Sequence, residues 1–549
     1  MLFLTSRKAL ARHVSVRLDK TFTKILQTPT LLLSRDQDIE SLSSSDSFIA
    51  IASPSPLLRH LVDSPSLFGK LDLIIAHDLH ALDPAYELLL SRLRWMHPNA
   101  RVVGSSSSLL DASDVSSWLG ATERSTYAFS PATRSSSLTT SFQSFSTPHS
   151  ASLLRSMVKP AYAAMRLASG STICFVPSRA QCRATAKDLV TQTAADLDES
   201  FVVGSIQTIE VYSRSISDPD LAEALSHGIA VFHEGLRPEE QRLALDLFNS
   251  GAVRILIASR EACWTLPVRA SLVIVMSAQY AIVKEDKERQ IKDYSLSELL
   301  QMQATAVPPR SDSSAECLIL CQVEQADVYS RFLLQGLPVE SELPEDSLLL
   351  STLFTDLVVG RIKTRQDMID SFSWTLFARR IESNPSYYHQ QTNGEINIDD
   401  QLSRLVDRLL LQLEARACVV FPGEKDDQVR LTQLGKLFGK RGLDLSSIER
   451  LQRSNLDRLV ILTAPAQRST ASNGEINRID DVAEDALKSF RSRLPRSIKD
   501  VIGAEVEGAD QEAMRRRVLL AAFQAGRIPR GAGNLEGEQV NLLEVLLDI

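Results

Sequence analysis

Residues Val231 to Tyr280 read VFHEGLRPEEQRLALDLFNSGAVRILIASREACWTLPVRASLVIVMSAQY. Apolar residues recur at helical spacing from Pro238 to Asn249, and two short apolar runs follow, Val253 to Ala258 and Ser271 to Met276. Short β-branched runs that alternate with helical periods are typical of βαβ units and a parallel sheet. Ligands of such sheets bind at the carboxyl ends of the strands. The sequence therefore predicts a binding edge at the residues that follow the two runs, Ser259-Arg260 and Ser277 to Gln279.

The overall composition is that of a soluble globular protein. The chain has 549 residues, 44% hydrophobic and 23% charged, which predicts roughly three to five domains at ~100–200 residues each. Its net charge of −8 argues against tight autonomous nucleic-acid binding, because phosphate contacts need clustered Lys and Arg. A basic groove inside an acidic protein stays open as an alternative. No uninterrupted apolar segment reaches the ~18 residues of a membrane helix, so we expect no membrane partner.

The six cysteines are scattered, most of them in or beside apolar runs. Cys317 and Cys321 form a C-x3-C pair within the run ECLILC, and no second pair completes a tetrahedral zinc site. This usage predicts buried, reduced thiols of an intracellular protein rather than a disulfide framework or a metal centre.

Four short stretches occur in a distinctive order: FVPSRAQCR (Phe175–Arg183), FHEGL (Phe232–Leu236), ILIASREACW (Ile255–Trp264) and LLQM (Leu299–Met302). They resemble motifs of superfamily 2 helicases. They are most similar to the second, C-terminal cassette of the Ski-like family of large spliceosomal U5 snRNP helicases, the "bad response to refrigeration" type. The resemblance spans nearly the whole chain, as a cassette truncated at both ends. It implies RecA-like domains and an RNA-handling particle as context.

The fold class implied is α/β, with two RecA-like parallel-sheet domains followed by a winged helix and an all-α Sec-homology helical bundle. The expected domains are a first RecA-like domain without a P-loop (1–145), a second RecA-like domain (146–340), a winged helix (341–425) and a partial helical bundle (426–549). Within the first, IAIASP resembles motif Ib, Ser106 to Ser108 resembles motif III, and DASDVSSWLG follows the family closely. The candidate strands there are Thr30–Leu33, Phe48–Ala52, Leu71–Ala76 and Arg101–Gly104.

The first twenty residues and the segment Ser125–Ser152 each allow two interpretations. The first twenty residues are acidic-poor and suit a mitochondrial transit peptide, but a strand at Leu2–Leu4 and a helix at Arg7–Leu18 resemble motif Ia, and we favour the folded interpretation. The Ser/Thr-rich segment Ser125–Ser152 has the composition of a disordered linker. Its place between two motif-bearing domains favours an extended crossing between the two lobes.

The predicted winged helix carries a leucine-rich stripe. Its members recur at helical spacing: Leu402, Leu405, Val406, Leu409, Leu410 and Leu413. A winged helix alone suggests duplex DNA readout, but this helix has too few Arg or Lys on one face. The continuous apolar stripe predicts packing against the RecA-like lobes, and Ala417 to Phe421 would form the wing strand.

The chemistry that the family needs for ATP turnover is altered. No G-x-x-x-x-G-K-[ST] sequence occurs. The family's Asp-Glu-x-His motif II aligns with His77-Asp78-Leu79-His80, so His77 replaces the metal-holding carboxylate, and Asp78 is one carbon shorter than the water-orienting Glu. His77 and His80, three residues apart at a strand end, could converge on a transition metal beside Asp78. A third strong ligand is not evident, and we expect no metal.

Motif VI of the family reads Gln-Met-x-Gly-x-Ala-x-Arg-Pro, often with a further Arg directly after the Gly. Here it begins at Gln301, and Thr305 and Pro308 occupy the positions of the expected cations; Arg310 lies beyond a rigid Pro-Pro pair. An arginine finger alone contributes ~10³–10⁵ in rate. We therefore predict no catalytic residues, and no cofactor in use, although ATP and Mg²⁺ are those of the family.

Three hypotheses follow. The favoured one is a catalytically degenerate helicase-like cassette in the nucleus, a scaffold for other splicing proteins or for an active helicase cassette. The alternative is an active ATP-dependent RNA helicase whose P-loop lies upstream of this chain. The third is passive binding of single-stranded RNA through residues that match motifs IV and V, with an ordinary surface or framework role as the competing interpretation: Arg179, His233, Ser259 and Arg260.

Overall fold

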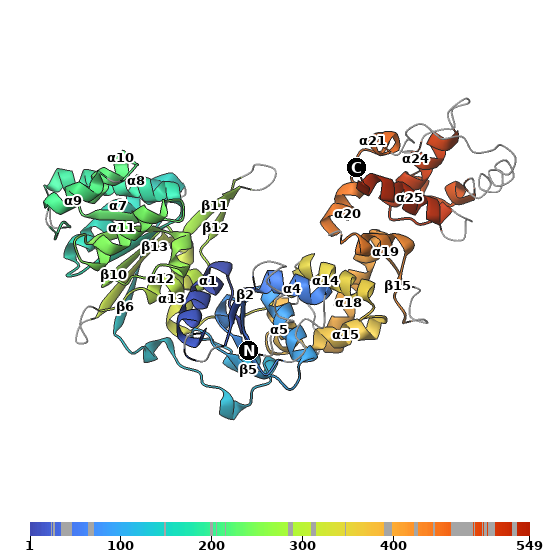
Figure 1. Ribbon diagram of the computed structural model, residues 1–549, viewed down its shortest axis with the longest axis horizontal. Coiled ribbons are helices and arrows are strands. Elements are labelled where there is room, and N and C mark those ends of the chain that lie inside the picture. Colours follow the sequence, from blue (N-terminus) through green and yellow to red (C-terminus); the bar gives the residue numbers. More distant parts are fainter. Residues whose placement is uncertain are drawn as a thin grey trace. The chain divides into compact units, whose positions relative to one another are not determined.

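The computed structural model describes most of the chain. The described residues are 1–23, 25, 28–33, 47–63, 71–147, 150–197, 201–204, 206–214, 216–283, 289–308, 314–345, 347–388, 398–421, 427–442, 445–462, 487, 489–496, 498, 502, 511–529 and 535–548. They divide into two compact units (Figure 1), of which the first comprises Met1–Pro54, Leu71–Leu82 and Ala100–Val339 and the second Ser55–Lys70, Asp83–Asn99 and Glu340–Ile549. No helix in the described part of the chain has the length and apolarity needed to cross a membrane.

The first unit contains a five-stranded parallel sheet in the order β2-β3-β1-β4-β5. Its strands are β1 (Leu2–Leu4), β2 (Thr30–Leu33), β3 (Ile49–Ala52), β4 (Leu73–Ala76) and β5 (Arg101–Gly104), and its helices include α1 (Lys8–Leu18) and α6 (Ala112–Trp118). The strand predicted at Leu2–Leu4 is confirmed and lies centrally, since Leu2 pairs with both Ala50 and Ile74. The other four predicted strands are confirmed as well.

The same unit contains a six-stranded parallel sheet in the order β6-β13-β10-β7-β9-β8. Its strands are β6 (Leu138–Phe145), β7 (Thr172–Val176), β8 (Ile229–Phe232), β9 (Ile255–Ser259), β10 (Leu272–Met276) and β13 (Ala315–Gln322). Alternate residues of β7 belong to two hydrophobic clusters, Ile173 and Phe175 to one, Cys174 and Val176 to the other. Both faces of the sheet are therefore buried, which explains why its strands are continuous apolar runs.

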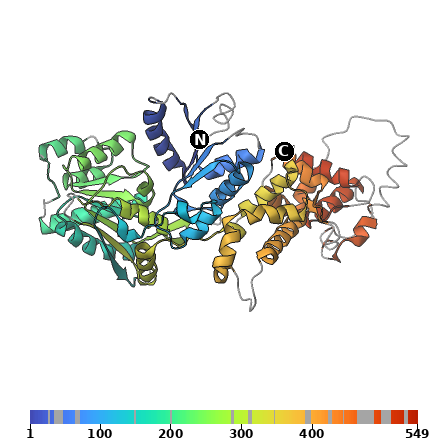
Figure 2. The same ribbon diagram turned by 90° about the horizontal axis from the view of Figure 1, so that it is seen from below.

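Helices cover both faces of this sheet (Figures 1 and 2). The cluster around Cys174 includes residues of α7 (Ser150–Leu167) and α8 (Arg179–Asp196). The cluster around Ile173 includes residues of four helices: α9 (Ile206–Ser213), α11 (Pro238–Asn249), α12 (Leu296–Ala304) and α13 (Val323–Gln335). Helix α10 (Pro219–Ser226) contributes residues to both clusters. The helix predicted at Pro238–Asn249 is confirmed. All six cysteines of the chain are free and buried, and burial raises the pKa of the Cys174 thiol to about 12.

Two segments contain strands that the sequence analysis did not predict. Part of Ser125–Ser152 is the edge strand β6, which pairs with β13 over eight residues. The linker composition misleads because one face of an edge strand is free to carry polar side chains. The second segment is a hairpin of β11 (Gln279–Val283) and β12 (Arg289–Asp293), whose tip lies outside the described residues.

The second unit contains the winged helix. Its elements are α14 (Ser347–Val359), α15 (Arg365–Ser373), α16 (Leu376–Ser383), α17 (Pro385–Tyr388), α18 (Ile398–Ala415), β14 (Val419–Val420) and β15 (Arg430–Leu431). All six residues of the apolar stripe on α18 are buried, and α18 packs on α14, α15, α16 and β14. The stripe is thus core, as predicted, but the observed packing partners belong to the winged helix. The predicted wing strand is confirmed in shorter form, with Val419 paired to Leu431.

Two helices that precede the winged helix in sequence belong to the same compact unit, apart from the first residue of α4. They are α4 (Pro54–Asp63) and α5 (Pro84–Met96). In the described part of the chain, the helices with defined bounds that follow it are α19 (Gln433–Lys440), α20 (Leu445–Gln452), α21 (Leu456–Leu462), α24 (Gln511–Gln524) and α25 (Leu535–Asp548). A Cβ on Gly435 would lie 2.1 Å from the carbonyl oxygen of Cys418, so only glycine allows α19 to approach β14 this closely.

Candidate functional site

The residues aligned with motif II follow β4 directly. Asp78 adopts φ 60° and ψ 44° and precedes a short 3₁₀ turn, Leu79–Ala81. Aspartate tolerates this left-handed conformation better than most residues. His77 Nδ1 lies 2.7 Å from Ser105 Oγ, and the backbone N–H of Ser107 donates to His80 Nδ1 at 3.2 Å. Both histidine rings therefore bond to the segment after β5.

This arrangement does not fit a magnesium ion. Mg²⁺ prefers an octahedral set of oxygen ligands, usually with one or two carboxylates, and Asp78 is the one carboxylate of the motif. Its Oδ1 lies 3.3 Å from His77 Nε2, while its Oδ2 is buried with no hydrogen-bond partner. Burial lowers the pKa of His80, against the opposing effect of Asp78. No group of three His, Cys, Asp or Glu side chains within the described residues is arranged to hold a metal.

The residues aligned with motif VI lie at the end of α12. Thr305 is buried, with 7% of its surface exposed. Its Oγ1 donates to the carbonyl of Met302 at 2.6 Å, and its carbonyl accepts from the N–H of Ala270, which precedes β10. Thr305, which stands where the family has a cation, therefore lies at a buried helix end at the amino edge of the second sheet. Gln301 and Pro308 are partly exposed, and Arg310 lies outside the described residues.

Three of the four candidate RNA contacts gather at the opposite, carboxyl edge of this sheet. Arg179, His233 and Ser259 follow or end β7, β8 and β9, which are neighbours. Glu234 joins two of them, because its carboxylate accepts from Arg179 Nε at 3.2 Å and from Ser259 Oγ at 3.0 Å. Burial lowers the pKa of His233, which disfavours a positive charge beside a phosphate.

Arg260, the fourth candidate, points elsewhere. Its guanidinium forms ion pairs with Glu298 and Glu261 and lies 3.8 Å from the ring centroid of Tyr280. Glu298 is buried with 2% of its surface exposed and also caps α12, since the N–H of Ser295 donates to it at 3.0 Å. The Arg260 side chain, 12% exposed, is therefore part of an internal network.

Sequence reasoning missed Glu234 and Glu298. Glu234 stands inside the FHEGL stretch, two residues after the last residue of β8, and recognising the apolar run Ile229–Phe232 as a strand would have placed it at the carboxyl edge. Glu298 stands three residues after Ser295, the spacing of a capping box. Its second role, as partner of Arg260, depends on a contact 38 residues apart in sequence.

Residues next to motifs Ia and II pack against the second sheet within the first unit. The Arg7 guanidinium lies 4.4 Å from the Trp264 ring centroid. Leu10 and Ala81 pack against the hydrophobic cluster around Ile173. The turn that carries the altered motif II is therefore adjacent to apolar packing.

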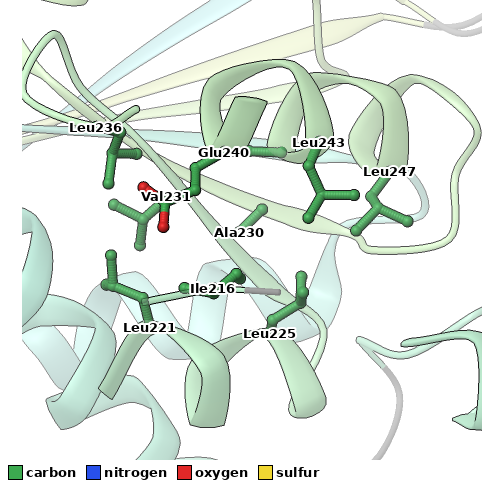
Figure 3. A pocket seen from close by; sticks show the side chains of 10 residues that line it. Ile216, Leu221, Leu225, Ala230, Val231, Leu236, Glu240, Leu243 and Leu247 are labelled. Carbon is green, nitrogen blue, oxygen red and sulfur yellow. The ribbon is translucent and has the colours of Figure 1, made fainter. Parts of the chain in front are cut away.

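A small cavity near β8 is too apolar to be a ligand site. It has a volume of about 20 Å³, close to the minimum that holds one water molecule. Figure 3 shows Leu221 and Leu225 of α10 facing Leu243 and Leu247 of α11 across it. Glu240, the charged residue of its lining, is held by Arg237, which lowers the pKa of its carboxyl to about 2. We interpret the cavity as a packing defect.

Known proteins resemble this chain in sequence. Residues 340–422 match a family model described as a Winged Helix-turn-helix domain. The human U5 small nuclear ribonucleoprotein 200 kDa helicase is 33% identical over 460 residues, 81% of this chain and 21% of that protein. The Pre-mRNA-splicing factor brr2 of Schizosaccharomyces pombe is 31% identical over 481 residues, 84% of this chain and 21% of that protein. The chain thus spans about a fifth of the length of these relatives.

Among solved structures, the DEAH/RHA helicase HrpB of Escherichia coli aligns with a TM-score of 0.47 and 16% identity, over 95% of this chain and 54% of that chain. The similarity to spliceosomal helicases that the sequence motifs predicted is confirmed, as are the mixed α/β fold with two parallel sheets and the winged helix.

Proposed function

Because this chain is a relative of the U5 small nuclear ribonucleoprotein 200 kDa helicases, we propose that it is a catalytically silent helicase cassette. Its role is that of a protein-interaction platform in pre-mRNA splicing, in the nucleus. The observation that carries the proposal is Thr305, a buried helix cap at a position where the family places a cation.

The size of the expected loss in the rate of ATP hydrolysis supports the proposal that the cassette is catalytically silent. An arginine that stabilises transition-state charge contributes ~10³–10⁵ in rate. The segment from Gln301 to Pro308 contains no Lys or Arg. Asp78 is left as a single carboxylate with a histidine in the place of its acidic neighbour. ATP and Mg²⁺ are the cofactors of the family, and these residues do not suit them.

The partners proposed are other splicing proteins or an active helicase cassette. We expect the purified chain to form a stable complex with the isolated first cassette of a U5 200 kDa helicase at micromolar concentration. The Asp78→Ala variant should bind equally well, because a platform does not use the altered motif. Sedimentation velocity measures both complexes. Absence of a complex, or its loss in the variant, contradicts this role.

Binding of single-stranded RNA is the second candidate function, favoured by the three candidates at one sheet edge. There Glu234 neutralises Arg179. Removing one charge beside a phosphate changes the binding free energy by about 1 kcal/mol at short range in water. We therefore expect Glu234→Gln to bind a uridine oligomer about fivefold more tightly at low salt, as measured by fluorescence anisotropy.

The matched control is Arg179→Ala in the Glu234→Gln background, which should abolish the gain. Equal affinity of the wild type and Glu234→Gln would exclude this edge as an RNA site. An active ATP-dependent RNA helicase, with its P-loop outside this chain, is the remaining alternative, and it predicts RNA-stimulated ATP hydrolysis.

A further inference from the structure

The second unit contains a cavity of about 310 Å³, a volume at the lower end of ligand-binding pockets. Helices α5, α14 and α15 line it. Its apolar lining consists of Leu88, Met96, Leu349, Leu353, Ile362 and Phe372. Trp95 and Trp374, both exposed, also belong to the lining. An apolar chamber with aromatic side chains that reach solvent is suited to a flat apolar group.

The cations of the lining are already paired. Arg361 Nη1 donates to Asp356 Oδ1 at 2.6 Å, and Arg92 bonds to the other oxygen of the same carboxylate. Burial raises the pKa of Asp356 and lowers that of Arg92, in each case against the opposing effect of its ion-pair partners. Within the lining, this buried network leaves little unpaired positive charge to attract an anionic ligand.

The remaining charged residues of the lining are acidic. Asp367 Oδ2 accepts from the backbone N–H groups of Lys363 and Thr364, both at 2.9 Å, at the start of α15. Asp370 is exposed and accepts from Gln366 Nε2 at 2.8 Å. Three aspartates therefore face two arginines around the cavity, and the exposed carboxylate is that of Asp370.

We propose that this cavity binds an aromatic side chain of a partner protein whose segment carries a basic residue beside the ring. The ring packs against Leu88, Leu353 and Phe372, and the cation pairs with Asp370. An acidic lining repels a phosphodiester backbone, so the occupant is a protein rather than RNA. The inference rests on the proposed platform function and names the chemistry of one partner.

Three small probes share one ring and differ in charge: 2-phenylethylamine, 2-phenylethanol and phenylacetate. We expect all binding to be weak and in the order amine, alcohol, acid. Each step should be about fivefold, the effect of one nearby charge in water. Saturation-transfer NMR on the full chain measures the three affinities without ATP or RNA. An active helicase would therefore leave this result intact.

Two variants locate the site. Ser371→Trp, at an exposed position of the lining, should block all three probes. Asp370→Asn should remove the preference for the amine over the alcohol and keep the alcohol bound. The proposal is overturned if no probe binds saturably, if phenylacetate binds best, or if Ser371→Trp binds like the wild type. Displacement of the amine by a uridine oligomer would make RNA the occupant and overturn it as well.

Discussion

Replacing Glu298 by alanine lowers the free energy of unfolding by about 3–5 kcal/mol, the range for removing one partner of a buried ion pair. Glu298 is 2% exposed and Arg260 is its partner. Without the Glu298 carboxylate, the Arg260 guanidinium still pairs with Glu261, which is half exposed, and still lies against the Tyr280 ring. The same substitution removes the acceptor for the Ser295 N–H at the start of α12. Urea denaturation followed by circular dichroism measures the change.

Glu261→Ala is the matched control, because it removes the exposed partner of the same arginine. Exposed ion pairs contribute little, so this variant should unfold close to the wild-type midpoint. If both variants lose the same stability, or neither loses any, Arg260 is not held by a buried pair. Arg260 would then be available for the RNA contact that motif V suggests.

Glu87 makes the stability of the second unit depend on pH. Its carboxyl is fully buried, and Oε1 accepts from the N–H of Phe377 at 2.8 Å, at the start of α16. Burial raises its pKa from 4.5 to about 7, although hydrogen bonds from Ser341, Phe377 and Leu376 oppose the shift. The folded protein therefore holds a proton that the unfolded chain releases between these two values.

A group whose pKa is raised by folding stabilises most at low pH. Its contribution is complete below 4.5 and is lost as the pH rises through about 7. At about 1.4 kcal/mol per unit, the wild type loses about 3 kcal/mol over this window. Urea denaturation at a series of pH values, with the transition of the second unit followed by Trp374 fluorescence, measures the loss.

Glu87→Gln separates this effect from other titrations. Glutamine keeps the size of the side chain and an oxygen that accepts from Phe377, and it does not ionise. The variant should match the wild type in mild acid and exceed it by the full amount in mild alkali. Parallel pH dependences in the two proteins would show that Glu87 does not titrate in this window.

The sequence predicts most strands of the sheets because each of these strands is an apolar run that can be recognised from its own residues. The run from Ile173 to Val176 is continuously apolar, so the side chains on both faces of the strand are apolar. This is the pattern of a strand that is buried on two sides. The edge strand β6 carries no such signal. Its eight residues are largely Ser, Thr and Gln, and pairing with β13, 177 residues away, makes them a strand.

The sequence predicts the sheet edge at which the candidate site lies better than it predicts the directions of the side chains. The sequence places Ser259 at the end of a predicted strand, and the resemblance to motifs IV and V singles out Arg179 and His233. The fold shows that all three lie at one edge of the sheet. The direction of Arg260 depends on Glu298, and no local pattern shows which carboxylate will be buried beside it. The same holds for Glu87, which the expected bounds place in the first RecA-like domain (1–145) and which the fold brings to the winged helix.

Phosphate release from Mg-ATP under single-turnover conditions, with protein in excess and uridine oligomer present, tests catalytic silence most directly. The buried Thr305 and the single carboxylate Asp78 predict release no faster than in buffer, and the same trace for Asp78→Ala. Mg²⁺-dependent release that RNA accelerates and that Asp78→Ala abolishes would show that the chain is an active ATPase.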